Sequence, residues 1–187
     1  MVYLSKGTVC NKSSERELHI SHGRQEFTLT GQQAEVWRNG RFALGYPKTE
    51  CEENITIQLA EMGLSEYEPE ETPICIYRVL TRCIFCASGS GGVRFPLFGA
   101  ERELMRWIKN AGLRLSTAEL IFLAENRIRP TADMLYEKNR QSLTERIYTS
   151  GTIYDRILEC RMEHAACRDR IVNLLLGLVK KKYLVAV

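Results

Sequence analysis

The sequence predicts a helix-rich α+β protein made of two small units, with small β-hairpins or short sheets and a long C-terminal helix. Three observations support this class: amphipathic helical segments that begin at capping residues, short β-prone segments between turn residues, and a glycine-serine run near mid-chain. Hydrophobic residues make up 44% of the 187 residues and charged residues 26%, so the chain can bury a core.

The first unit opens with a predicted β-hairpin. Glu17–Ile20 and Gln25–Leu29 have the character of short strands, and residues 21–24 between them can form a turn. Gly23 within that turn is free to adopt the positive φ that tight hairpins require.

Two capped helices are predicted after the hairpin. Thr30 with Gln33, and Thr49 with Glu52, match the capping box, in which the two side chains satisfy backbone N–H groups of the first turn. The first helix should run to about residue 42, and Gly63 is well placed to end the second.

The first unit should close with an acidic segment and an apolar one. Ser65–Thr72 contains proline and four glutamates, which indicates a loop or a sheet edge. Ile74–Ala87 is rich in β-branched, aromatic and cysteine residues, a composition typical of one bent strand or a pair of strands.

A run of small residues, Ser88–Gly92, predicts a linker. We therefore expect units at residues 1–87 and 97–187, joined by a linker at 88–96. Residues 1–93 hold nine Lys/Arg and twelve Asp/Glu, whereas residues 94–187 hold seventeen and eleven. A polyanionic partner should meet the C-terminal half, and an ordinary solvated surface is the alternative interpretation of these charges.

Three helices and a strand are predicted in the second unit. The helices cover about Gly99–Asn110, a segment from Ser116 to about residue 126 that opens with a Ser116/Glu119 capping box, and about Thr131–Ile147 after Pro130. Tyr183–Val187 should form the final strand.

Apolar or small residues recur at 4-3 spacing from Ile153 to Leu178, with charged residues on the other faces. This pattern is typical of one helix of roughly 30 residues, about 40 Å long at 1.5 Å per residue. Two helices with a tight turn near Met162–Ala166 are the alternative. A heptad-like stripe can also pair with a second copy, so Ile153–Leu178 is a candidate homodimer interface.

An internal repeat is a further prediction. Leu29–Phe42 aligns with Leu115–Ile128: a leucine precedes a hydroxyl N-cap in both, and an arginine with an apolar residue closes both. Chance similarity between capped helices is the alternative. The order of a hairpin, helices and a strand resembles winged-helix proteins, in tandem, over about two thirds of the chain, and it implies duplex DNA binding through a helix in the major groove.

Two cysteine groups have the spacing of metal ligands. Cys83 and Cys86 form a C-x-x-C near Cys75, yet a structural zinc site normally has four ligands and a redox C-x-x-C normally opens a helix. The second group, on one face of the predicted long helix, comprises Cys160, His164 and Cys167. We expect buried core residues in both groups and no metal or cofactor, with metal or redox chemistry as the alternative. The odd total of seven cysteines indicates reduced thiols.

The densest basic stretch lies in the second unit, where side chains of this type would pair with nucleic-acid phosphates. The predicted nucleic-acid-binding residues are Arg127, Arg129, Lys138, Arg140, Arg146, Arg156, Arg161, Arg168 and Arg170.

These observations favour a DNA-binding transcriptional regulator that uses winged-helix-like units, with double-stranded DNA as its partner. The alternative is a non-enzymatic protein–protein interaction module or adaptor. No catalytic signature such as G-x-S-x-G or H-E-x-x-H is present, so we expect no enzyme. No apolar run reaches the roughly 18 residues of a membrane span, and the N-terminus lacks a signal-peptide pattern, so a cytoplasmic location is expected.

Overall fold

A computed structural model describes residues 1–10, 13–14, 17–88, 97, 99–110, 116–129 and 154–187. The elements in this part of the chain are β1 (Val2–Ser5), β2 (Thr8–Val9), β3 (Glu17–His22), β4 (Gln25–Thr30), α1 (Gly31–Asn39), α2 (Glu50–Glu61), β5 (Ser65–Glu68), α3 (Pro73–Thr81), β6 (Phe85–Ala87), α4 (Gly99–Asn110), α5 (Thr117–Glu125), α7 (Tyr154–Glu163), α8 (Arg170–Lys180) and β7 (Leu184–Ala186). Helices combined with small antiparallel sheets confirm the predicted helix-rich α+β class. None of the helices described is long and apolar enough to cross a membrane.

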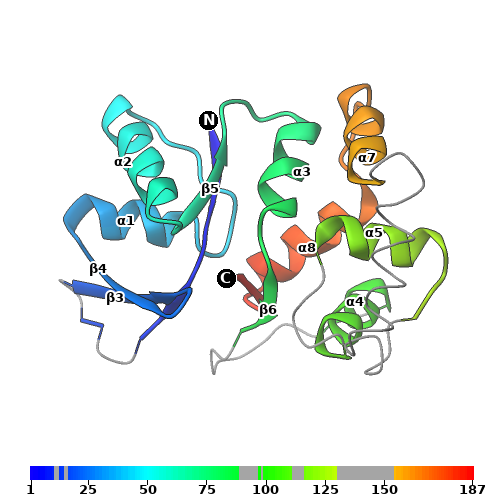
Figure 1. The fold of residues 1–187 in the computed structure, drawn as a ribbon, viewed down its shortest axis with the longest axis horizontal. Helices are drawn as coiled ribbons and strands as arrows, with labels where there is room; N and C mark the ends of the chain where they lie inside the picture. Colours follow the sequence, from blue (N-terminus) through cyan, green and yellow to red (C-terminus); the bar gives the residue numbers. More distant parts are fainter. Residues whose placement is uncertain (11–12, 15–16, 89–96, 98, 111–115, 130–153) are drawn as a thin grey trace.

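Strand β1 forms a wall between two hydrophobic cores. It pairs antiparallel with β5, and all four of its residues are buried. Because successive side chains of a strand point to opposite faces, Val2 and Leu4 enter the larger core, whereas Tyr3 enters the smaller one. In Figure 1, β5 and the blue N-terminal strand lie between α1 and α2 on one side and α3 on the other.

The smaller core lies between the β3–β4 hairpin and helices α1 and α2. Leu18, Ile20 and Leu29 from the hairpin are buried together with Trp37 of α1 and Leu59 of α2. The inward residues of each strand alternate with more exposed ones, as expected when one face of a hairpin covers a core.

The predicted hairpin is confirmed, and its strands extend to His22 and Thr30. Gly23 and Arg24 form the turn, with φ values of 57° and 69°. Positive φ at both central positions matches the right-handed twist of the flanking strands, which is why two-residue hairpins favour this conformation.

Helices α1 and α2 occupy the predicted segments, but neither predicted capping box forms in full. At α2 Thr49 is the N-cap, while the carboxylate of Glu52 accepts a hydrogen bond from the N–H of Lys48 at 2.6 Å. The Thr49 hydroxyl accepts a hydrogen bond from the backbone N–H of Glu52 at 3.2 Å. Thr30 makes no side-chain cap hydrogen bond, and Gly31, which follows it, has a φ of 52° outside the helical region. The capping box predicted for α1 is therefore wrong, while the helix itself is correct.

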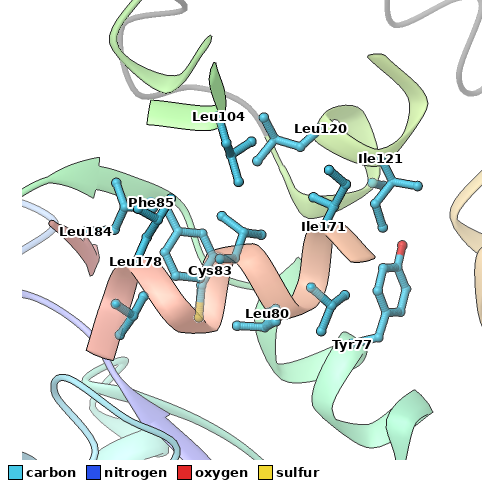
Figure 2. Packing of buried hydrophobic residues seen from close by; sticks show 14 of the residues in the cluster. Tyr77, Leu80, Cys83, Phe85, Leu104, Leu120, Ile121, Ile171, Leu178 and Leu184 are labelled. Atoms are coloured by element: carbon cyan, nitrogen blue, oxygen red, sulfur yellow. The ribbon is translucent and has the colours of Figure 1, made fainter. Parts of the chain in front are cut away.

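The larger core surrounds helix α8. Figure 2 shows α8 crossing the cluster, with Leu104 and Leu120 on one side and Tyr77 and Leu80 on the other. Its members come from α3, α4, α5, α7 and α8 and from strands β1, β6 and β7. Strand β7 pairs antiparallel with β6, so residues 184–186 lie beside residues 85–87.

The strand or strand pair predicted for Ile74–Ala87 is wrong over most of its length, because Pro73–Thr81 forms helix α3. The hydroxyl of Thr72 accepts a hydrogen bond from the N–H of Cys75 at 3.3 Å, and Pro73 occupies the first turn, where a missing N–H costs nothing. Burial against the larger core overrides the β-propensity of this segment. Upstream, Ser65–Glu68 forms strand β5, in agreement with the sheet-edge alternative.

The predicted long C-terminal helix is also wrong: α7 and α8 are separate helices, as in the two-helix alternative. Asp169 caps α8 by accepting a hydrogen bond from the N–H of Ile171 at 2.7 Å. Helix α7 buries Leu158 and Met162, whereas Ile157 on the predicted stripe is 41% exposed. The apolar stripe therefore faces the core in α8 but not in α7.

The two-unit division with a linker at 88–96 stays a prediction, since all of that linker except Ser88 lies outside the described residues. The helix predicted at 131–147 lies outside them as well. Among the residues described, Phe85 belongs to the same hydrophobic cluster as Leu104 and Leu184. The N–H of Ser88 donates to the carbonyl of Tyr183 at 2.8 Å, which extends the β6–β7 pairing toward the linker.

Candidate functional site

Six of the nine predicted nucleic-acid-binding residues lie in the described part of the chain, and all six are exposed. They are Arg127, Arg129, Arg156, Arg161, Arg168 and Arg170. They follow α5, lie along α7, or flank the start of α8, and α5 packs against both of these helices. The other three, Lys138, Arg140 and Arg146, lie outside the described residues.

Helix α5 positions the first of these arginines. Its start is the predicted capping box: Ser116 accepts from the N–H of Glu119 at 3.2 Å, and the Glu119 carboxylate accepts from the N–H of Ser116 at 2.7 Å. Its end is a Schellman motif, in which the N–H of Arg127 donates to Ala124 O and the N–H of Ile128 donates to Leu123 O.

The Schellman motif places Arg127 in the left-handed region, with a φ of 54°. Glycine is usual at this position because its missing Cβ avoids a clash with the backbone. An arginine there is uncommon and costs conformational energy, and such strained residues cluster at functional sites.

Arg161 differs from the other arginines because it already has an acidic partner. Its guanidinium contacts the carboxylate of Glu125 at 2.8 Å and so joins α7 to the end of α5. A second ion pair joins Glu159 of α7 to Arg78 of α3 at 3.2 Å. The hydrogen bond from Arg78 to Glu159 is the main cause that raises the pKa of Arg78 above its usual value.

Most acidic side chains described after residue 97 are similarly engaged. Glu101 binds Lys181, Glu125 binds Arg161, Glu159 binds Arg78, and Glu119 and Asp169 cap helices. By contrast, five of the predicted arginines form no ion pair with another described residue. These are Arg127, Arg129, Arg156, Arg168 and Arg170.

Three of these arginines line one cavity. Arg127, Arg129 and Arg170 border a hollow of about 530 Å³ between α4, α5 and the start of α8. The apolar part of its lining includes Trp107 of α4 and Ile121 of α5. Arg156 and Arg161 border a separate hollow of about 370 Å³ on α7, together with Ile157 and Cys160.

The sequence did not indicate this cavity. Trp107 lies in the predicted helix next to apolar Ile108, but nothing in the local pattern distinguishes a cavity wall from an ordinary core position. The three arginines come from sites up to 43 residues apart in the sequence, and packing between helices brings them together.

Neither cysteine group forms a metal site among the residues described. Cys83 and Cys86 are buried, as expected, and burial raises the pKa of the Cys83 thiol to about 12. Cys160, His164 and Cys167 are exposed, so the expectation of buried core residues is wrong for this group. Helix α7 ends at Glu163, so Cys167 does not share a helical face with Cys160, as it would in a single long helix.

Comparisons with protein-family models, with curated proteins and with solved structures find no match. The fold and the site define the class of the chain: a helix-rich α+β protein with three arginines around a cavity in its C-terminal half. The resemblance to winged-helix proteins and the internal repeat stay predictions.

Proposed function

We propose that this protein is a DNA-binding regulator that contacts duplex phosphates through the arginines around α5, α7 and the start of α8. The proposal is supported by a difference between the acidic and the basic side chains of the C-terminal half. Its described carboxylates are mostly engaged within the protein, while Arg127, Arg129, Arg156, Arg168 and Arg170 have no acidic partner among the residues described.

Guanidinium groups suit this role because their planar fork can donate two hydrogen bonds to one phosphate. Contacts of this kind orient a protein on the duplex and carry no sequence information by themselves. The N-terminal half, with twelve Asp/Glu against nine Lys/Arg in residues 1–93, would repel phosphates and so orient the basic half toward DNA.

The proposal is tested by fluorescence anisotropy of the full chain with mixed-sequence duplex DNA over a range of salt concentrations. We expect binding that weakens steeply with salt, because each phosphate contact releases condensed counterions. Removing one phosphate contact, as in Arg156→Gln or Arg170→Gln, should lower the slope of log K against log salt by about one.

Arg24→Gln is the matched control, since Arg24 is exposed in the distant β3–β4 turn. It should leave both the affinity and the salt slope unchanged. The proposal is rejected if duplex DNA does not bind at low salt, or if the control weakens binding as much as the two arginine variants do.

A second candidate function, a protein-interaction module that self-associates, is favoured by the outer face of α7. Ile157 is 41% exposed there and borders the smaller hollow with Cys160, Arg156 and Arg161. A homodimer through this part of the Ile153–Leu178 segment would bury that side chain. Sedimentation velocity should then show a dimer that Ile157→Glu dissociates, and a monomer at all concentrations would exclude it.

A further inference from the structure

The cavity between α4, α5 and α8 has an apolar floor. Leu104, Trp107, Ile121 and Ile171 line it and are at most 9% exposed. Figure 2 shows Ile121 and Ile171 near the start of α8 and Leu104 on the side of Leu120, all within the larger core. The four side chains of the floor belong to the larger hydrophobic core, and the volume of the cavity, about 530 Å³, falls in the range of small-molecule sites.

The rim of the cavity carries both signs of charge. Three arginines and the acidic residues Glu103, Glu125 and Asp169 line it. Two of these acidic residues are engaged within the protein: Glu125 forms an ion pair with Arg161, and Asp169 is the N-cap of α8. Arg127, Arg129 and Arg170 form no ion pair with another described residue, whereas two of the three acidic residues are engaged.

Arg127 borders the rim from a left-handed backbone conformation. An arginine at a φ of 54°, where glycine would end α5 without strain, is maintained at a conformational cost. Its neighbour Ile128 closes the same turn by donating to Leu123 O at 2.9 Å and packs against the larger core. The turn thus fixes the backbone from which Arg127 borders the cavity.

We propose that this cavity is a binding site for a small apolar anion, a molecule with an aromatic or aliphatic body and a carboxylate or phosphate head. The apolar body would lie on Trp107, Leu104 and Ile121, where its burial removes hydrocarbon surface from water. The anionic head would lie at the rim, where guanidiniums donate paired hydrogen bonds to carboxylate or phosphate oxygens. This site does not depend on DNA binding, because the ligand would bind in the absence of nucleic acid.

Trp107 provides a direct signal of occupancy. The chain has two tryptophans, and Trp37 lies in the smaller core, where its indole N–H donates to Lys6 O at 3.0 Å. Octanoate, octyl phosphate and octanol are suitable probes, since they share one apolar chain and differ in the head group. Titration calorimetry and tryptophan emission of the full chain, without DNA, measure their affinities.

We expect saturable binding of octanoate or octyl phosphate with a change in Trp107 emission that Trp107→Phe abolishes. The anion that binds more tightly shows whether the site prefers a carboxylate or a phosphate head group. Octanol should bind at least about tenfold more weakly than that anion, because a charge-assisted hydrogen bond to a guanidinium is lost.

Arg127→Gly and Arg170→Gln should each weaken binding of the anion by about tenfold or more and leave the affinity for octanol unchanged. Arg24→Gly is the matched control for Arg127→Gly, because Arg24 also has a positive φ, 69°, and lies in the hairpin of the other half. It removes the same charge and the same backbone strain, and it should leave anion binding unchanged.

The proposal is overturned if neither anion saturates the protein, if octanol binds as tightly as the anions, or if Arg24→Gly weakens binding as much as Arg127→Gly. Circular dichroism of each variant separates loss of the site from loss of the fold. A failure of DNA binding alone would leave the result of these titrations unaffected.

Discussion

The guanidinium of Arg41 donates a hydrogen bond of 2.8 Å to the carbonyl oxygen of Ala186, a residue 145 positions later in the chain. This contact joins the turn after α1 to strand β7, and the guanidinium also lies 5.1 Å from the ring centroid of Trp37. Arg41 is only 5% exposed, and burial lowers its pKa to about 10. Burying the charge of Arg41 therefore costs free energy, whereas the packing of its side chain between the two halves stabilises the fold.

Arg41→Ala should lower the free energy of unfolding by about 2–4 kcal/mol, because it removes a buried stem and a charge-assisted hydrogen bond. Arg41→Met keeps most of the volume and removes the desolvated charge, so its cost should stay below about 1.5 kcal/mol. Urea denaturation of both variants measures this difference. Equal losses would mean that the hydrogen bond and the ring contacts, not the packed stem, provide the stabilisation.

Arg127→Gly and Arg24→Gly should each raise the free energy of unfolding by roughly 0.5–1 kcal/mol. Glycine relieves about 1–2 kcal/mol of Cβ strain in the folded state, and its greater conformational entropy in the unfolded state offsets part of this gain. Both residues have positive φ and are exposed. Thermal and urea unfolding check the gain. A loss of stability in Arg127→Gly alone would show that its side chain contributes to folding rather than to binding.

Ser116→Ala should destabilise the protein by about 1 kcal/mol, because the N–H of Glu119 loses its cap. Thr30→Ala at the start of α1 is a matched control, since Thr30 makes no side-chain cap hydrogen bond. It should change the free energy of unfolding by only a few tenths of a kcal/mol. Urea midpoints of the two variants provide the comparison, and equal effects would contradict the cap geometry.

His22 should make stability depend on pH below neutrality. Burial first, and then the positive charge of Lys6, lower its pKa below 6.5, while Glu66 opposes them. Between pH 6.5 and the lower folded pKa the unfolded chain binds a proton that the folded chain does not, so stability falls as the pH is lowered.

Proton NMR should show His22 titrating below pH 6.5, and His22→Gln should reduce the loss of stability on acidification. A His22 resonance that titrates at or above 6.5 would refute this prediction. So would an equal acid dependence in the two proteins.

Local sequence signals predicted those elements whose stabilising contacts lie within a few residues. The β3–β4 hairpin follows from Gly23 and its neighbours, and the α5 capping box follows from Ser116 and Glu119. The start of α2 follows in the same way from Thr49. These hydrogen bonds and turn conformations involve nearby residues, so the rest of the chain hardly alters them.

Local sequence signals gave wrong predictions where burial in the core determined the secondary structure or the buried face of a helix. The β-prone composition of residues 74–81 yields to helix α3, which presents Ile76, Tyr77 and Leu80 to the larger core. Helix α7 likewise buries Leu158 and Met162 instead of the apolar stripe through Ile157. In the first segment burial favoured a helix over a strand, and in the second the neighbouring elements selected one of two apolar faces.

Local patterns in the sequence are enough to predict the fold class, the charge difference between the halves, the turn of the β3–β4 hairpin and the N-caps of α2 and α5. Packing between distant segments establishes that β1 separates two cores, that α7 and α8 are distinct helices, and that Arg127, Arg129 and Arg170 share one cavity with Trp107. Caps and turns are satisfied by hydrogen bonds between neighbours in sequence, whereas burial and cavities depend on side chains that meet only after the chain has folded.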